Sequence, residues 1–447
     1  MKQDLTSGPI TRTLLIFALP MTVGNLLQQF YNIADTLIIG RFVGANALAA
    51  VGSSYTLMTF LTSILLGLSM GSGVAVSIAW GKGDMDRLKQ SVFLSFAGIF
   101  LAAVVLSLIA FFGIDGIMEL LQVPEEISGL MRTYLLVIFA GIGGTFLYNY
   151  FASLLRAVGN SVTPLIFLGV SAAVNVVLDL VFVLVFPWGV AGAALATIIA
   201  QWMSGIGLVI YTAVKVPELR IGREHMRWNK ETAANIFRLS SITSAQQSIM
   251  NFGILMVQGR VNSFGPAVMA AFAAAVKIDS FAYMPVQDFG NAFSTFIAQN
   301  YGAGRHERIR RGIRSALKTA AVFGLAVSAV IWVFAGSLMG IFVDGSEREI
   351  LAIGISYLRI EGAFYCLIGI LFLLYGFFRA IERPGMSVVL TVVSLGLRVL
   401  LAYTLSAVPA LGVTGIWISI PVGWLLADIT GLVPLAGFYR KIGGEKE

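Results

Sequence analysis

The chain has 447 residues, of which 57% are hydrophobic and only 12% are charged. Soluble globular proteins carry about 25% charged residues, so the composition excludes an ordinary water-soluble protein and indicates an integral membrane protein. The formal net charge is +7, but the basic residues lie in loops between apolar segments, and we therefore expect no nucleic-acid partner.

Twelve apolar segments follow one another along the chain, and each is long enough for a helix to cross a membrane. An α-helix rises about 1.5 Å per residue, so about 30 Å of hydrocarbon requires roughly 20 residues. The first segment contains Pro20 and several polar residues but no small-residue cleavage pattern, so it is predicted to span the membrane and not to be a signal peptide. The predicted spans are residues 13–40, 53–80, 90–113, 130–156, 163–186, 189–214, 234–260, 268–299, 315–337, 350–379, 386–408 and 412–436.

Basic residues are concentrated in alternate loops between these spans. Six Lys or Arg lie in GAGRHERIRRGIRSALK after the eighth span, and five lie in the central loop KVPELRIGREHMRWNK. The intervening loops GIDGIMELLQVPEEIS and VDGSEREI are acidic. Because basic loops remain on the cytoplasmic side, we predict a multi-pass protein in the lipid bilayer of the inner (plasma) membrane, with both termini cytoplasmic.

Several kinds of chemistry lack the residues that they need. Cys366 is the only cysteine and falls within a span, which excludes an intramolecular disulfide and leaves redox or thiolate-metal chemistry without support. His225 and His306 lie in basic loops, so an imidazole relay across the membrane is excluded. No G-x-x-x-x-G-K-[ST] motif is present, which excludes an ATP-driven pump. We therefore expect neither an enzyme nor a bound cofactor.

An internal repeat relates the two halves of the chain. LLRAVGNSVTPLIFLGVSAAVNVVLDLVFV, which begins at Leu154, matches FFRAIERPGMSVVLTVVSLGLRVLLAYTLS 223 residues later. WGKGDMDRLKQ, at Trp80, matches YGAGRHERIRR 221 residues later. Two six-helix lobes are predicted, residues 1–222 and 223–447, and six spans in each make the repeats parallel. A central cleft between the lobes is then expected to bind the substrate.

A group of polar residues within the spans belongs to the first half alone. Gln28, Asn32 and Asp35 form a stripe at i, i+4 and i+7 on the first span. Asn175 and Asp179 lie one helical turn apart on the fifth. The second-half equivalents of Asp35, Asn175, Asp179 and Thr197 are Ile254, Arg398, Ala402 and Ile420. A shared structural requirement would appear in both halves, so we expect one site in the first half, without a counterpart in the second.

The two carboxylates of this site need a neutralising partner. A charge at the bilayer centre costs about 2.5 to 3.5 kcal/mol, and the first six predicted spans have no Lys or Arg within their cores. A proton could neutralise one of two neighbouring carboxyls. Sodium, a hard monovalent cation, could instead bind the oxygens of Asp35, Asn175, Asp179 and Thr197. The alternative interpretation is a carboxyl-amide hydrogen bond that only holds helices together.

The motifs of the chain resemble those of the multidrug and toxic compound extrusion (MATE) transporters, in particular the prokaryotic DinF-like branch. The resemblance covers nearly the whole chain and rests on LPMTVGNLLQQFYNIADTLIIGRFVGANALAAVG at Leu19, WGKGDMD, LLRAVGNSVTP, NVVLD, GVAGAALAT, NYGAGR and FFRAIERPG. It implies two six-helix lobes that alternate between outward-facing and inward-facing states, with efflux of organic cations in exchange for protons or sodium.

The same resemblance implies roles for individual residues. Asp35 is expected to be the coupling centre, and Pro20 is expected to permit bending of the first helix, since a proline also removes a helix hydrogen bond. The expected partners of Asp35 are Asn175, Asp179 and Thr197. The expected polar network around them comprises Gln28, Asn32, Tyr134 and Asn149.

The second half also carries charged residues within its predicted spans. They are Asp279, Asp288, Glu361 and Asp428, with Lys277, Arg398 and, near an end, Arg379. Glu361 or Asp288 is expected to form a structural ion pair with Arg398. Alternatively, an unpaired Asp288 faces the cleft and attracts a cationic substrate.

The sequence thus predicts an all-α membrane protein with twelve transmembrane helices in two pseudo-symmetric six-helix lobes. Its predicted function is secondary active efflux of small lipophilic organic cations in exchange for protons or sodium, and we expect it to act as a monomer. The alternative is a flippase for a lipid-linked precursor. Such a protein would need cationic residues in its cleft to bind phosphates, whereas the buried charges of the first lobe are acidic.

Overall fold

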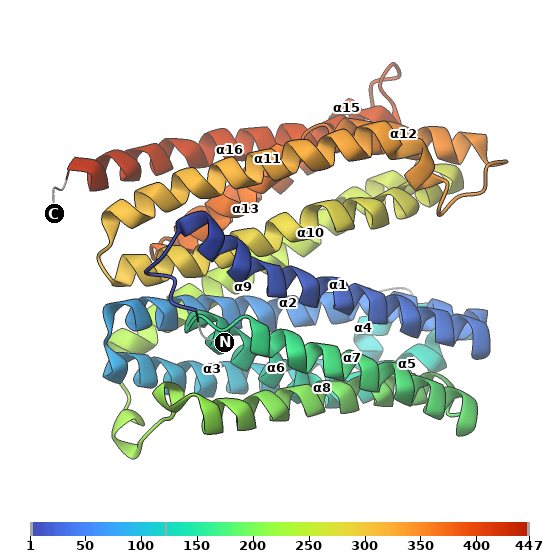
Figure 1. Ribbon diagram of the computed structural model, residues 1–447. Helices are drawn as coiled ribbons and strands as arrows, with labels where there is room; N and C mark the ends of the chain where they lie inside the picture. Colours follow the sequence, from blue (N-terminus) through green and yellow to red (C-terminus); the bar gives the residue numbers. More distant parts are fainter. Residues whose placement is uncertain (1–2, 121–122, 445–447) are drawn as a thin grey trace. The chain divides into compact units, whose positions relative to one another are not determined.

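The computed structural model describes residues 3–120 and 123–444, and this part of the chain is helical without a β-strand (Figure 1). Within it, nine helical segments are long and apolar enough to cross a membrane. Two bent pairs of helices meet the same requirement when each pair counts as one span. A further helix, α9 (Lys230–Asn262), has 33 residues but a more polar sequence. The predicted all-α membrane fold is confirmed.

The helices follow the order of the predicted spans. The first half contains α1 (Ile10–Phe42), α2 (Ala45–Lys82), α3 (Met85–Phe112), α4 (Ile114–Leu120), α5 (Glu125–Ala140), α6 (Ile142–Ala157), α7 (Val162–Leu180), the π-helical turn η1 (Val181–Val185) and α8 (Gly189–Lys215). After the short turns η2 (Pro217–Leu219) and η3 (Arg223–His225), the second half contains α9, α10 (Pro266–Gly302), α11 (His306–Met339), α12 (Arg348–Gly362), α13 (Tyr365–Ala380), α14 (Pro384–Thr391), the π-helical turn η4 (Val392–Gly396), α15 (Leu397–Leu405) and α16 (Val413–Gly444).

Several helices continue beyond the apolar run that predicted them. The span predicted to begin at residue 315 belongs to α11, which begins at His306. The Glu307 carboxylate forms ion pairs with Nη1 of Arg310 at 3.3 Å and with Nε of Arg311 at 2.9 Å. Pairs at these spacings stabilise a helix surface, so the charged turns before the apolar run are helical too.

Two predicted spans each consist of two helices that meet at an angle. α5 and α6 are bent by 47° at Gly141, and α12 and α13 are bent by 53°. A Cβ atom at Gly141 would lie 2.2 Å from the side chain of Ile198 on α8. The bend therefore requires glycine at this position, because α8 occupies the space that any other side chain would need.

Contacts between the helices divide the described chain into two compact units. Unit 1 contains Gln3 and the residues from Val23 to Ser244, and unit 2 contains Asp4–Thr22 and the residues from Ala245 onward. Both boundaries fall inside helices, so α1 and α9 each contribute residues to both units.

Glycines allow close helix packing within each unit. In unit 1, a Cβ atom at Gly205 on α8 would lie 2.9 Å from the carbonyl oxygen of Gly144 on α6. In unit 2, a Cβ atom at Gly376 on α13 would lie 2.5 Å from the carbonyl oxygen of Gly290 on α10. Small residues at such crossings are typical of membrane helices, where close packing replaces the hydrophobic effect as the source of association.

The segment before α1 is held in unit 2 by the start of α11. Leu5 is fully buried. Arg308 donates to carbonyl oxygens within the segment Leu5–Gly8 from three nitrogens, at 3.3, 2.7 and 2.5 Å. Arg305 donates to the Thr6 carbonyl at 2.6 Å. These arginines supply the donors that an extended segment without secondary structure lacks.

Candidate functional site

In unit 1 a small apolar core joins the second part of α1 to α2, α5, η1 and α8. Its buried side chains are Ile38, Ile39, Ala47, Val51, Tyr134, Ile138, Val183, Val190, Ala193 and Ala194. Asp35 lies one helical turn before Ile39 on α1, and Thr197 lies one turn after Ala193 on α8. The core therefore positions both polar side chains.

The candidate site consists of four polar residues from α1, α7 and α8. Asn175 Nδ2 donates to Thr197 Oγ1 at 3.4 Å, and Thr197 Oγ1 donates to the carbonyl oxygen of Ala193 at 3.1 Å. The carboxyl groups of Asp35 and Asp179 lie beside each other. α7 and α8, which carry Asn175, Asp179 and Thr197, pack side by side in Figure 1.

Most oxygens of this site lack a hydrogen-bond donor. No described residue donates to either carboxylate oxygen of Asp179, to Oδ1 of Asp35 or to Oδ1 of Asn175. Asp179 is 0% exposed and Asn175 is 2% exposed. An unsatisfied buried polar group costs about 1–3 kcal/mol, so four such oxygens together are unfavourable unless a positive charge neutralises them. A proton shared by the two carboxyls would supply one of the missing donors.

Two tyrosines add hydroxyl groups near the carboxylates. Tyr134 on α5 is 3% exposed and lies near both Asp35 and Asp179. Tyr31 lies one helical turn before Asp35, interacts with that carboxylate, and is hydrogen bonded to Gln28. Tyr134 and Gln28 were predicted to lie near the site and Tyr31 was not, although the i, i+4 spacing of Tyr31 and Asp35 is visible in QQFYNIAD.

The other residues expected near the site have different surroundings. Asn149 on α6 donates to the carbonyl oxygen of Thr145 in its own helix at 2.9 Å, and no described contact joins it to the carboxylates. Asn32 is half-buried, and its backbone carbonyl accepts a hydrogen bond from Thr36. Pro20 lies within α1, in the part of that helix that belongs to unit 2.

The helix that carries Asp179 changes its winding directly after the carboxylate. α7 ends at Leu180, and the π-helical turn η1 follows. Val183 in this turn packs into the same apolar core as Tyr134. Single π-helical turns are rare and occur frequently at functional sites, so the local geometry at the end of α7 is unusual where the candidate site is formed.

A second group of polar side chains, buried except for the half-buried Arg398, lies in unit 2. It comprises Asp279, Tyr357, Glu361, Tyr365 and Arg398. Arg398 interacts electrostatically with Glu361 and with Asp279, so the expected structural pair of Arg398 with Glu361 stays a prediction within this larger cluster. Asp288 is 2% exposed on α10, and the electrostatic partners that the structure defines for Arg398 are Asp279 and Glu361.

Comparison with known proteins identifies the class of this protein. The MatE family profile matches residues 20–181 and 240–404, well over half of the chain. The chain belongs to the MATE family. Its relatives in this family are transporters, so the protein is a transporter and not an enzyme.

Relatives of this MATE chain match it over nearly its whole length. The probable multidrug resistance protein YpnP of Bacillus subtilis is 32% identical over 98% of this chain and 96% of its own length. The FAD transporter of Shewanella oneidensis is 25% identical over 96% of this chain and 95% of its own length. A solved structure, the outward-facing conformation of a multidrug resistance MATE family transporter of the MOP superfamily, has a TM-score of 0.92 and 24% identity, covering 99% of this chain and 98% of its own. That likeness shows the fold.

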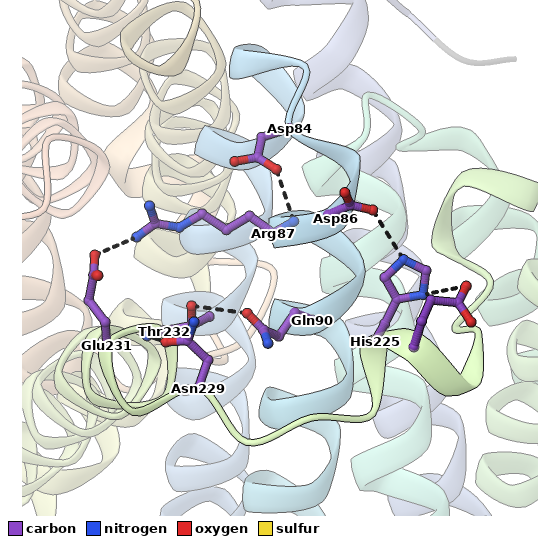
Figure 2. A pocket seen from close by; sticks show the side chains of 9 residues that line it. Asp84, Asp86, Arg87, Gln90, His225, Asn229, Glu231 and Thr232 are labelled. Atoms are coloured by element: carbon purple, nitrogen blue, oxygen red, sulfur yellow. Dashed lines mark hydrogen bonds and ion pairs between the residues drawn. The ribbon is translucent and has the colours of Figure 1, made fainter.

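The MATE chain also has a polar cavity of about 470 Å³ in unit 1, formed by the start of α3, the turn η3 and the start of α9 (Figure 2). Arg87 pairs with Glu231 at 3.4 Å, and His225 Nε2 lies 3.3 Å from Asp86. His225 Nδ1 accepts a hydrogen bond from the backbone N–H of Gly222 at 3.1 Å. The charged side chains of Arg87 and Glu231 in this cavity thus pair with each other, in contrast to the donor-free oxygens at Asp35 and Asp179.

Proposed function

We propose that this MATE transporter is a secondary active antiporter that exports lipophilic organic cations in exchange for protons or sodium. The observation that carries the proposal is the group of four buried acceptor oxygens without donors at Asp35, Asn175 and Asp179. A proton or a small cation is the ligand that such a group stabilises most. An intramembrane carboxylate without a basic partner is a functional-site hypothesis by default.

The same side chains suit both coupling ions. A proton between Asp35 and Asp179 would remove the repulsion between two carboxylates that lie beside each other. A sodium ion would use the oxygens of Asp35, Asn175, Asp179 and Thr197, which are hard ligands for a hard cation. The nearby hydroxyl of Tyr134 can donate to whichever carboxylate remains charged.

The location of the site supports coupling through α1. Asp35 and Pro20 lie on the same helix, and the packing of that helix changes from unit 2 to unit 1 between Thr22 and Val23. Neutralising Asp35 would alter the cost of burying the second part of α1 in unit 1. A proline nearby lowers the resistance of the helix to bending, so the charge on one side chain would bias the shape of the whole helix. This is the step that we assign to alternating access of the two predicted lobes.

The driving force can be estimated from the charges moved. One monovalent ion that crosses 100 mV supplies about 2.3 kcal/mol, and a tenfold concentration gradient adds about 1.4 kcal/mol. Together they could sustain roughly a 500-fold gradient of a neutral substrate per ion. Export of a monovalent cation opposes the same field, so a one-for-one exchange is electroneutral and only the chemical gradient drives it.

The acidic character of the buried site supports a cationic substrate. A second candidate is an anionic substrate, because one relative is named a FAD transporter and FAD carries phosphates. A flippase for a lipid-linked precursor would belong to the same anionic class. The basic loops GAGRHERIRRGIRSALK and KVPELRIGREHMRWNK support cytoplasmic termini, and we expect the monomer to be the functional form.

Transport by the purified protein in proteoliposomes tests this proposal. A fluorescent quaternary ammonium dye should be driven by an imposed proton gradient or an imposed sodium gradient, measured in separate experiments. Asp35→Asn should fold, as judged by size-exclusion chromatography, and lose gradient-driven transport. If Asp35→Asn concentrates the dye at close to the wild-type rate, the assignment of Asp35 is wrong. If FAD moves and the dye does not, the anionic class replaces the cationic one.

A further inference from the structure

Asp428 on α16 is a buried carboxylate that does not belong to the proposed ion site in the first half. It is 2% exposed, and no described residue donates a hydrogen bond to either of its oxygens. Among the described residues no basic side chain neighbours it. A carboxylate that served helix packing would be expected to have a donor on a neighbouring helix, so packing does not explain this residue.

The polar groups around Asp428 are hydroxyls. Tyr375 on α13 is 6% exposed and lies close enough to interact with the Asp428 carboxyl. The Tyr375 hydroxyl is itself hydrogen bonded to the side chains of Thr391 and Ser394, at the end of α14 and in η4. Thr391 in turn donates to the Ser387 carbonyl at 2.9 Å. Tyr375 is the one titratable group that the structure sets beside Asp428 within the described chain.

Close packing prevents Asp428 from turning away from these helices. A Cβ atom at Gly423 on α16 would lie 2.4 Å from the Ser394 carbonyl oxygen, and one at Gly431 would lie 2.7 Å from the Leu374 side chain. Both glycines lie within two helical turns of Asp428, one on each side along the helix. α16 is therefore pressed against η4 and α13 above and below the carboxylate. In this conformation the short side chain of Asp428 is therefore held away from water, and only a change in the packing of α16 would expose it.

The repeat indicates that the scaffold does not require a carboxylate at this position. At the offset of 223 residues, the first-half counterparts of Asp428, Tyr375 and Thr391 are Gly205, Ala152 and Leu168. Gly205 packs against the backbone of α6. In the first half the position equivalent to Asp428 therefore has no side chain and serves as a close helix contact. The polar group around Asp428 is specific to the second half, as the group around Asp35 is specific to the first.

We propose that Asp428 is a second proton-binding site, which gains a proton from water on one side of the membrane and releases it on the other during each transport cycle. The inference rests on the proposed antiport. A proton needs only one carboxylate oxygen, whereas sodium needs several oxygens, and the Tyr375 hydroxyl is already bonded to Thr391 and Ser394. One positive charge at the Asp35 site and a second at Asp428 would enter for each monovalent cation exported, so the exchange would be driven by voltage as well as by the proton gradient.

Infrared difference spectroscopy of the purified full chain in liposomes detects the proton directly. Lowering the pH should produce the carbonyl stretching band of a protonated carboxyl, and Asp428→Asn should remove one component of that band. Glu119→Gln, which changes an exposed carboxylate on α4, is the matched control and should leave the Asp428 component of the band in place. If Asp428→Asn leaves every component in place, or if sodium at constant pH removes the Asp428 component, the proton assignment is overturned.

Voltage dependence of transport tests the role of this proton in the cycle. Wild-type efflux of the quaternary ammonium dye should increase with an inside-negative potential at zero pH gradient. Asp428→Asn should lose this dependence and retain transport driven by a pH gradient. An equal voltage dependence in wild type and Asp428→Asn would overturn the second site. If neither a proton gradient nor a sodium gradient drives wild-type transport, the antiport proposal fails, and the infrared band still decides whether Asp428 binds a proton.

A variant of Tyr375 tests the proposal even if Asp428→Asn does not fold. Tyr375→Phe keeps the ring and removes only the hydroxyl beside the carboxyl. It should displace the pH midpoint of the Asp428 component without abolishing the band. An unchanged midpoint would place that protonated carboxyl away from Tyr375 and contradict the assignment.

Discussion

Replacing Asp179 with asparagine is expected to stabilise the protein while it abolishes ion coupling. Asp179 is fully buried, lies beside Asp35, and has two oxygens without donors. Asparagine has nearly the same shape and removes the charge. Its amide can also donate to Asp35 or to Oδ1 of Asn175, which lacks a donor. Residues kept for function at the expense of stability commonly behave in this way.

The size of the effect follows from two contributions. A new hydrogen bond contributes about 0.5–1.5 kcal/mol, and removing an ionised side chain from the membrane interior relieves up to about 2.5–3.5 kcal/mol. Since the two contributions are not additive, we expect a gain of about 1–3 kcal/mol at about pH 8. Protons remove the carboxylate repulsion in the wild type as the pH falls, so the difference between variant and wild type should shrink at about pH 5.

Thermal unfolding in detergent, followed by tryptophan fluorescence at the two pH values, measures this difference. Asp179→Asn should melt several degrees above the wild type at the higher pH and close to it at the lower pH. Glu119→Gln, at an exposed position, should follow the wild type throughout. A variant that melts well below the wild type at both pH values would mean that the Asp179 carboxylate holds helices together, and the helix-packing interpretation would replace the ion site.

Two further predictions concern structure. Arg308→Ala removes three hydrogen-bond donors to the segment Leu5–Gly8, so limited proteolysis should cleave that segment at least several-fold faster than in the wild type. Arg311→Ala changes only an ion pair on the helix surface, and its segment should be cleaved at the wild-type rate. Gly376→Ala inserts a methyl group 2.5 Å from a carbonyl oxygen of α10 and should lower the free energy of unfolding by about 1–3 kcal/mol, measured by thermal unfolding. Gly385→Ala, whose added methyl group meets no atom within 4 Å, should leave the stability unchanged. Equal melting temperatures of the two variants would contradict the described contact between α10 and α13.

The spans were predictable because lipid imposes a simple requirement on sequence. A crossing helix needs roughly 20 apolar residues, and that requirement is visible without knowledge of any contact. The ends were less predictable, since the first turns of α11 are charged and yet helical. Hydropathy marks where a helix lies in lipid, whereas the helix itself continues for as long as its side chains support it.

Contacts between distant segments were the part that sequence could not supply. The need for glycine at residue 141 depends on Ile198 from another helix, and no local pattern reveals such a partner. For the same reason, the expected pairing of Arg398 with Glu361 left out Asp279, which lies on α10.

The first-half site was more accessible to sequence reasoning because the repeat acts as an internal comparison. Asp35 and Asp179 have apolar counterparts, Ile254 and Ala402, which marks them as unusual before any contact is known. Tyr31 escaped this comparison because aromatic residues are common within membrane spans, and only its spacing from Asp35 distinguishes it.

The glycine opposite Asp428 in the repeat bears on the history of the two halves. Gly205 leaves no room for a side chain, because a Cβ atom there would touch the carbonyl oxygen of Gly144. If an ancestor had two identical halves that packed in this way, both positions held a small residue and the aspartate arose after duplication, whereas α16 now makes its close contacts at Gly423 and Gly431. A matching carboxylate in the first half is blocked sterically at Gly205, so a polar group like that around Asp428 cannot form at the equivalent place in the first half without repacking α6 and α8.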